Sequence, residues 1–122
     1  MQQNVLIVEG EDNVALALSM VLREWGYGVQ RVGQAEQARD VGHHDIVMID
    51  STLPDGSGFQ LCQDLSQAEG QRPPIILMIN NHSPLEHRKA LAQGATTVLS
   101  KPFDSLMLRQ ALDTVSRRAE LA

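Results

Sequence analysis

Five short apolar runs alternate with segments of helical periodicity, and this alternation restricts the fold more than any other feature of the chain. The runs are NVLIVE, YGVQRV, DIVMID, PIILMI and TVLS, at 4–9, 27–32, 45–50, 74–79 and 97–100. NVLIVE and DIVMID are apolar at nearly every inner position, as expected for strands that are buried on both faces. Strands that alternate with helices predict a parallel sheet covered by helices on both sides.

The segments between these runs repeat apolar residues three or four positions apart, which indicates amphipathic helices. In the first of them, Asp12 or Asn13 is expected to cap the start and Gly26 to follow the end. Later helices are expected at 35–41, after Gly58, at 85–93 and at 104–121. The expected packing residues are Val14, Leu18, Val21, Leu22 and Trp25 in the first helix, Phe59, Cys62 and Leu65 in the third, and Leu106, Leu108, Leu112 and Val115 in the last.

Length and composition restrict the class of protein. A chain of 122 residues, 43% of them hydrophobic and 20% charged, is expected to form one globular domain. A formal net charge of −5 and an aromatic content of 3% argue against a nucleic-acid-binding surface. No apolar run reaches the ~20 residues of a membrane span, and no secretory signal segment is expected. The single cysteine, Cys62, excludes an internal disulfide and favours a reducing compartment.

Polar residues stand at the carboxyl ends of several expected strands. Glu9 ends the first strand, Asp50 ends the third, and Lys101 follows the fifth. Ligands of an open α/β sheet bind outside the carboxyl ends of its strands, where the strand order reverses. Carboxylates there can accept a phosphoryl group and bind Mg²⁺, and a lysine can contact a phosphoryl oxygen. The pattern therefore predicts phosphoryl chemistry at this edge of the sheet.

The sequence also resembles a known family over its whole length. The resemblance rests on VLIVEGED at the first strand, DIVMIDSTLPDGSGF around Asp50, Gly94–Ala95, and SKPF at Lys101–Pro102. These segments are similar to those of the receiver domains of two-component response regulators. The resemblance implies a flavodoxin-like, doubly wound α/β fold with five helices and five parallel strands in the order 2-1-3-4-5. It also implies one receiver domain over 1–122, either a single-domain regulator or the N-terminal part of a longer one.

The resemblance implies roles for individual residues. Asp50 is expected to be the phosphoacceptor and Lys101 the lysine that contacts the phosphoryl group. Glu9, Asp50 and the backbone carbonyl of Thr52 would hold Mg²⁺, and Glu11 is a further candidate ligand. The residues expected to shape the surrounding loops are Pro54, Gly58 and Pro102, the last of them after a cis bond.

Three positions depart from the family's pattern. Receiver domains normally carry two adjacent acids at the end of the first strand, and here the residues are Glu9 and Gly10, so Mg²⁺ binding is expected to be weakened. Ile79 stands where the family has a threonine or serine whose hydroxyl contacts the phosphoryl group. Val98 stands where it has a tyrosine or phenylalanine that turns inward on activation. Asn80 is a substitute hydrogen-bond donor in one interpretation and an ordinary loop amide in the other.

Two main functional interpretations share this fold. In the first, the chain is a phosphoacceptor receiver domain of a two-component or phosphorelay system, phosphorylated on Asp50 by a histidine kinase or a phosphotransfer protein. In the second, it is a degenerate receiver that binds a partner independently of phosphorylation. A small flavin carrier of the same topology is a third alternative, which the absence of a phosphate-binding loop after the first strand disfavours. None is an independent enzyme, because the site would at most phosphorylate itself and remove the group again.

Partners and location are expected from the family. The fourth and fifth helices are the expected surface for a homodimer or a downstream output domain, with no direct contact to nucleic acid or membrane, and the expected location is cytoplasmic. Other polar side chains are interpreted as structural. The loop pair His43–His44 is expected to be solvated, with metal binding as the alternative. His82 and His87 lack partners for a zinc site, Ser57 is expected to be a turn or cap residue, and Arg117–Arg118 a solvated helix end or the lead into a following domain.

Overall fold

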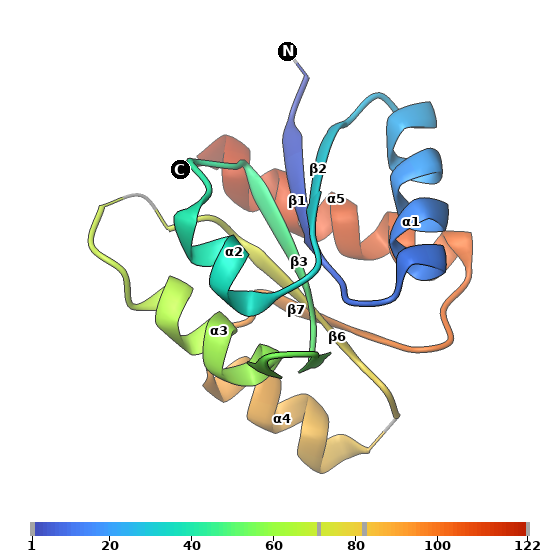
Figure 1. The fold of residues 1–122 in the computed structure, drawn as a ribbon. Coiled ribbons are helices and arrows are strands. Elements are labelled where there is room, and N and C mark those ends of the chain that lie inside the picture. Colours follow the sequence, from blue (N-terminus) through green and yellow to red (C-terminus); the bar gives the residue numbers. More distant parts are fainter. Residues whose placement is uncertain (1, 71, 82, 122) are drawn as a thin grey trace.

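The centre of the molecule is a parallel sheet of five strands in the spatial order β2-β1-β3-β6-β7 (Figure 1). The computed structural model describes residues 2–70, 72–81 and 83–121, with side chains described as far as Ser116. The strands are β1 (Asn4–Val8), β2 (Gly28–Val32), β3 (Ile46–Asp50), β6 (Ile75–Ile79) and β7 (Thr97–Ser100). In chain order this is the predicted arrangement 2-1-3-4-5, so the doubly wound fold is confirmed.

In the part of the chain that the structure describes, five helices cover the sheet. They are α1 (Asp12–Glu24), α2 (Ala35–Asp40), α3 (Gly58–Ser66), α4 (Pro84–Ala92) and α5 (Ser105–Leu121). Helices α1 and α5 pack on one face of the sheet, and α2, α3 and α4 pack on the other (Figure 1). Side chains alternate along each strand, so that Val5 and Ile7 of β1 join the core under α1 and α5, while Leu6 and Val8 join the opposite core.

Burial on both faces accounts for the apolar strands. Every residue of β3 and β6 is buried, whereas the residues of the edge strand β2 are half-buried or exposed. Each aliphatic side chain that is fully removed from water contributes roughly 1.5–3 kcal/mol, so the central strands supply much of the driving force for folding. Cys62 lies in the core on the α3 side, as predicted, and burial raises the pKa of its thiol to about 11.

The boundaries of the elements differ from expectation in a few places. Neither Asp12 nor Asn13 caps α1, because Glu11 is the N-cap residue and makes no side-chain capping bond. Gly26 follows the end of α1 with a φ of +94°, which glycine adopts without strain. The prediction that Leu106 packs in the core is wrong, since its side chain is 65% exposed. Leu108, Leu112 and Val115 are buried, as predicted.

A short antiparallel hairpin, β4 (Thr52–Leu53) with β5 (Gly56–Ser57), stands between β3 and α3 where only a loop was expected. Its last residue caps α3, because the Ser57 hydroxyl oxygen accepts from the Gln60 N–H at 3.4 Å, and the predicted capping role of Ser57 is confirmed. The predictions for His82 and for the Arg117–Arg118 side chains lie outside the described residues.

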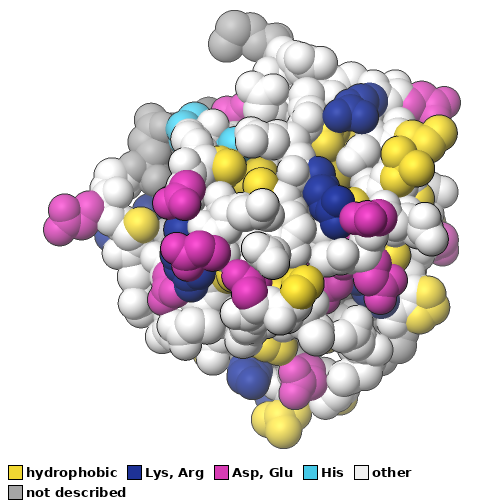
Figure 2. All heavy atoms as spheres, in the orientation of Figure 1, with side chains coloured by type: hydrophobic (Ala, Val, Ile, Leu, Met, Phe, Trp, Pro, Cys, Tyr) yellow, Lys and Arg dark blue, Asp and Glu magenta, His cyan; other side chains and the backbone are white. Residues whose placement is uncertain are grey.

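Acidic and basic side chains are interspersed on the visible face of the molecule, with no broad field of basic groups there (Figure 2). This distribution agrees with the net charge of −5. In the part of the chain that the structure describes, no helix has both the length and the apolar character that crossing a membrane requires.

Candidate functional site

The carboxyl ends of β1, β3 and β7 bring three of the predicted site residues together. Glu9 directly follows β1, Asp50 is the last residue of β3, and Lys101 follows β7. The Lys101 Nζ donates to Glu9 Oε1 and to Asp50 Oδ2, each at 2.7 Å. The side chains of Glu9 and Asp50 are only 1% and 8% exposed, and that of Lys101 is 20% exposed. One ammonium group therefore bridges two buried carboxylates.

Burial and mutual contact set the charge state of this cluster. Burial raises the pKa of Glu9, and the neighbouring Asp50 adds to the rise, while the Lys101 ammonium opposes it. For Lys101 burial works in the direction of a lower pKa, but hydrogen bonds to Asp50 and Glu9 outweigh it and the pKa is raised. With both acids ionised, two negative charges face one positive charge, so the cluster retains a net attraction for a further cation.

The hairpin after β3 holds the Asp50 carboxylate in place. The Thr52 N–H donates to Asp50 Oδ1 at 2.9 Å, and the Thr52 hydroxyl accepts from Asn80 Nδ2 at 3.2 Å. Asn80, the residue after β6, is thus linked to the loop of Asp50 through Thr52. Gly58 passes so close behind Asp50 that a β-carbon there would overlap the Asp50 carbonyl oxygen, which explains why only glycine fits.

Gly10 is closely packed against the same loop. A β-carbon on Gly10 would lie 2.8 Å from Cδ and 2.9 Å from Cγ of Pro54. These separations are shorter than real β-carbon contacts, so the proline ring stands where an acidic residue at position 10 would begin. Pro54 therefore shapes the site by filling the space beside β1. The predicted cis bond between Lys101 and Pro102 is present.

Two of the predicted carboxylate ligands for a metal ion meet, and the third does not join them. Glu9 and Asp50 share Lys101, whereas the exposed Glu11 contributes only its backbone N–H, which donates to Glu9 Oε2 at 3.2 Å. Within 2–70, 72–81 and 83–121, no group of three or more histidine, cysteine or acidic residues is placed to hold a metal ion. Mg²⁺ can bind through one or two carboxylates with water completing its octahedron, and that is the donor set that this site offers.

The two positions that lack the family's usual side chains are built into the hydrophobic structure. Ile79, at the end of β6, is buried, and Val98 of β7 packs half-buried against the core under α2, α3 and α4. The Ile79 carbonyl accepts from the Lys101 N–H at 2.7 Å, so its backbone supports the site even though its side chain offers no hydroxyl.

Two further polar residues near the site were not singled out from the sequence. Arg31 of β2 donates from Nε and Nη2 to the Glu9 carbonyl, at 2.9 and 2.6 Å, and from Nη1 to Asp12 Oδ1 at 2.8 Å. Asp55, at the tip of the hairpin, accepts from the first N–H groups of α2, which lowers its pKa. The signal for Arg31 was its place near the carboxyl end of the strand that neighbours β1.

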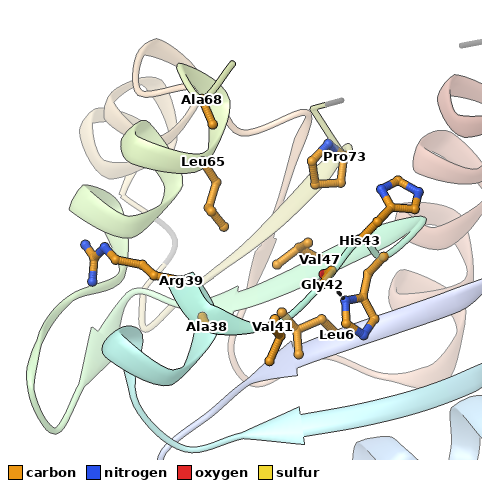
Figure 3. Close-up of a pocket in the computed structure, with 11 residues that line it drawn as sticks. Leu6, Ala38, Arg39, Val41, Gly42, His43, Val47, Leu65, Ala68 and Pro73 are labelled. Carbon is orange, nitrogen blue, oxygen red and sulfur yellow. Dashed lines mark hydrogen bonds between the residues drawn. The ribbon is translucent and has the colours of Figure 1, made fainter. Parts of the chain in front are cut away.

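A hollow of about 460 Å³ lies between α2 and α3, at the end of the sheet opposite to Asp50 (Figure 3). Its floor is apolar, with Leu6, Val47 and Leu65 among the lining residues. Among the described residues that line this hollow, the charged side chain is Arg39, which pairs with Asp64 of α3 at 2.7 Å.

The prediction that His44 is solvated is wrong. Its side chain is largely buried, with Nδ1 3.0 Å from the Gly42 carbonyl and Nε2 2.9 Å from Gln30 Oε1.

Comparison with known proteins decides the family. The profile described as the response regulator receiver domain matches residues 5–113. The chain belongs to the response regulator receiver domain family. It is 26% identical over 120 residues to the cell cycle response regulator CtrA of Brucella ovis, covering 95% of this chain and 51% of the relative. The chain thus spans about half the length of the curated relatives that it matches.

Solved structures agree with this assignment. A putative response regulator from Chloroflexus aurantiacus superimposes with a TM-score of 0.85 at 27% identity, covering 96% of this chain and all of that one. The BeF3-activated N-terminal receiver domain of Klebsiella pneumoniae RstA gives a TM-score of 0.84 at 26% identity, covering 93% and 98% of the two chains. Receiver domains generally use Mg²⁺ for phosphorylation, interact with histidine kinases and output domains, and are generally not catalytic enzymes.

Proposed function

We propose that this receiver domain accepts a phosphoryl group on Asp50 from a histidine kinase or a phosphotransfer protein. An Asp50 carboxylate oxygen attacks the phosphorus, and the bond from phosphorus to the donor breaks with its electron pair leaving on the donor. The contact of 2.7 Å between Lys101 Nζ and Asp50 Oδ2 carries the proposal, because it places a cation beside the carboxylate that would be phosphorylated. Self-phosphorylation from a small donor and loss of the group to water are the only reactions proposed for the domain alone.

Mg²⁺ is the cofactor of this proposal. Glu9, Asp50 and the backbone carbonyl of Thr52 would hold it, with Glu11 as an additional acid at the edge of the site. The ion would neutralise negative charge on the transferred group. Because Gly10 supplies no carboxylate, we expect the affinity for Mg²⁺ to be lower than in receivers with two adjacent acids.

The test is phosphorylation of the purified chain with a small acyl phosphate at millimolar Mg²⁺. Intact-mass measurement should show the gain of one phosphoryl group, and Asp50→Asn should abolish it. Asp64→Asn is the matched control, since Asp64 is an acid on α3 that pairs with Arg39 at 2.7 Å away from the site. Absence of a mass gain in the wild-type chain, or an equal gain in Asp50→Asn, contradicts the proposal.

The phosphorylation-independent receiver is the competing interpretation, and it is distinguished by partner binding. Buried Ile79 and half-buried Val98 lack the groups through which relatives couple the phosphoryl group to their surface. If phosphorylation controls the protein, the phosphorylated wild type and Asp50→Asn bind the partner with different affinities. Equal affinities of the phosphorylated wild type and Asp50→Asn would favour the competing interpretation.

The surface proposed for a second copy or an output domain is formed by α4 and α5. Leu85 and Leu91 of α4 and Leu106 of α5 are among the large apolar side chains that are exposed. Apolar side chains that gather in one exposed patch are typical of surfaces that bind another protein, and we propose such a patch on these two helices. We propose a cytoplasmic location for the domain, by analogy with the family's partners.

A further inference from the structure

The Arg31 guanidinium lies across the end of β1. Two of its nitrogens, Nε and Nη2, donate to the Glu9 carbonyl at 2.9 and 2.6 Å. A third, Nη1, pairs with Asp12 at 2.8 Å, at the first turn of α1. The Arg31 side chain is 29% exposed and that of Asp12 is 90% exposed, so the bonds to the Glu9 carbonyl are the more sheltered part of the arrangement.

These bonds act on the peptide group that joins Glu9 to Gly10. Glycine leaves a backbone free to adopt more conformations than any other residue, and here it directly follows the residue that reaches into the site. Arg31 holds that peptide group from the β2 side, and the Pro54 ring packs against Gly10 from the β3 side. The two contacts together restrict a turn that has no side chain of its own to fix it.

The direction of the Glu9 side chain depends on this turn. Its carboxylate accepts from Lys101 Nζ at 2.7 Å and from the Glu11 N–H at 3.2 Å. Both donors hold the carboxylate and not the backbone from which it extends. The Glu9 N–H donates to the Val32 carbonyl at 3.1 Å, and Arg31 holds the carbonyl of the same residue without touching the carboxylate.

We propose that Arg31 is a positioning residue of the phosphorylation site, which keeps the Glu9 carboxylate directed toward Lys101 and Mg²⁺ by holding the Glu9–Gly10 peptide. The proposal rests on the function proposed above, and it assigns to a basic residue of the edge strand the restraint that the glycine cannot provide. Loss of Arg31 should release the Glu9 side chain toward solvent, and so weaken Mg²⁺ binding and reduce the burial of Glu9.

The test compares Mg²⁺ titrations of the full chain, followed by the amide NMR signals of Glu11 and Thr52. We expect Arg31→Ala to raise the Mg²⁺ dissociation constant by about tenfold, a typical effect of losing a residue that orients a metal ligand. The Mg²⁺ dissociation constant of Arg31→Lys should lie between those of the wild type and Arg31→Ala, because a single ammonium cannot donate through the planar pair of N–H groups that a guanidinium offers. Asp12→Asn should have a smaller effect than Arg31→Ala, since both bonds to the Glu9 carbonyl remain.

Hydrogen exchange of the Glu11 amide provides a readout that needs neither Mg²⁺ nor phosphorylation. In Arg31→Ala the protection of this amide should fall, because release of the Glu9 side chain breaks the hydrogen bond of 3.2 Å from the Glu11 N–H to Glu9 Oε2. Arg39→Ala is the matched control, as it removes another arginine that donates to an aspartate at 2.7 Å, between α2 and α3. It should leave both readouts at their wild-type values.

The outcomes separate this proposal from the proposed function. If the folded Arg31→Ala protein keeps the wild-type Mg²⁺ affinity and the wild-type protection of the Glu11 amide, the positioning role is overturned, whether or not Asp50 is phosphorylated. If Asp50 is never phosphorylated but Arg31→Ala lowers the Glu11 protection, the proposed function fails and the positioning role stands. Should Arg31→Ala not fold, Arg31→Lys decides: wild-type protection and affinity overturn the role, and a loss of both supports it.

Discussion

The two halves of the acidic site are held in place by different means. On β3 and β7, Asp50 and Lys101 are joined directly by their side chains at 2.7 Å, with residue types that are usual in receiver domains. On β1, an acid is replaced by Gly10, and contacts of Arg31 and Pro54 with the backbone restrain the strand end. The comparison teaches that a strand end without a second carboxylate can still be contacted closely through its backbone by neighbouring residues.

The largest effect on stability is expected from removing the ion pair between Asp50 and Lys101. Lys101→Met removes the cation between two buried carboxylates, and the loss of one partner from a buried ion pair typically costs 3–5 kcal/mol. We therefore expect the free energy of unfolding at about pH 7 to fall by roughly 3 kcal/mol, as measured by urea denaturation.

A second substitution checks the cause of that loss. Glu9→Gln, added to Lys101→Met, leaves one carboxylate in place of two and should recover part of the lost stability. An equal loss in the single and double variants would show that the Lys101 chain stabilises by packing and not by charge.

A smaller effect on stability is expected from placing an acid at position 10, at the end of β1. Gly10→Asp places a β-carbon within 3 Å of the Pro54 ring, and overpacking of this kind costs about 1–3 kcal/mol. Adding Pro54→Ala should restore stability and let the new carboxylate strengthen Mg²⁺ binding, which the same amide titration measures. If Gly10→Asp alone is as stable as the wild type, the proline loop moves aside freely and the close packing imposes no restraint.

The smallest effect concerns Glu9 alone and depends on pH. Burial raises the folded-state pKa of Glu9 above its ordinary value, so the folded state binds more protons than the unfolded state at pH values between the two. The corresponding stability is complete below the unfolded pKa and is lost as pH rises through the folded pKa. Glutamine has no charge to bury, so Glu9→Gln should be more stable than the wild type near pH 7, on the order of 1 kcal/mol.

Denaturation curves at about pH 4 and pH 7 check this expectation. The advantage of Glu9→Gln should shrink toward zero at the lower pH, where Glu9 is protonated in both states. A difference that stays constant between the two pH values would mean that the Glu9 ionisation is not its source.

The fold was predictable because its signals are local and repeated. Apolar strands such as 45–50 alternate with amphipathic helices, and both patterns follow from which faces are buried. Leu106 was wrongly predicted to pack in the core, because the helical period does not determine how wide the buried stripe of α5 is at its first turn. The hairpin of β4 and β5 escaped prediction because two-residue strands carry no periodicity.

The site was predictable where a residue's own type carries the chemistry. Glu9, Asp50 and Lys101 are charged groups at strand ends, and the topology of the sheet brings such ends together. Arg31 was missed because its contact is with the backbone carbonyl of another residue, which has no counterpart in residue type or spacing. The burial of His44 was missed for a similar reason, since its hydrogen-bond partners lie on β2 and in the preceding loop.

The core position of Cys62 makes the chain convenient for site-directed labelling. The thiolate is the reactive form of cysteine, and a thiol that is buried, with a pKa of about 11, is almost entirely protonated and sheltered from reagents at neutral pH. Because Cys62 is the single cysteine of the sequence, a second one introduced at an exposed position such as Leu106 would take up a spin label or fluorophore selectively. Whether α5 moves when the chain is treated with an acyl phosphate can thus be measured without first replacing a core residue.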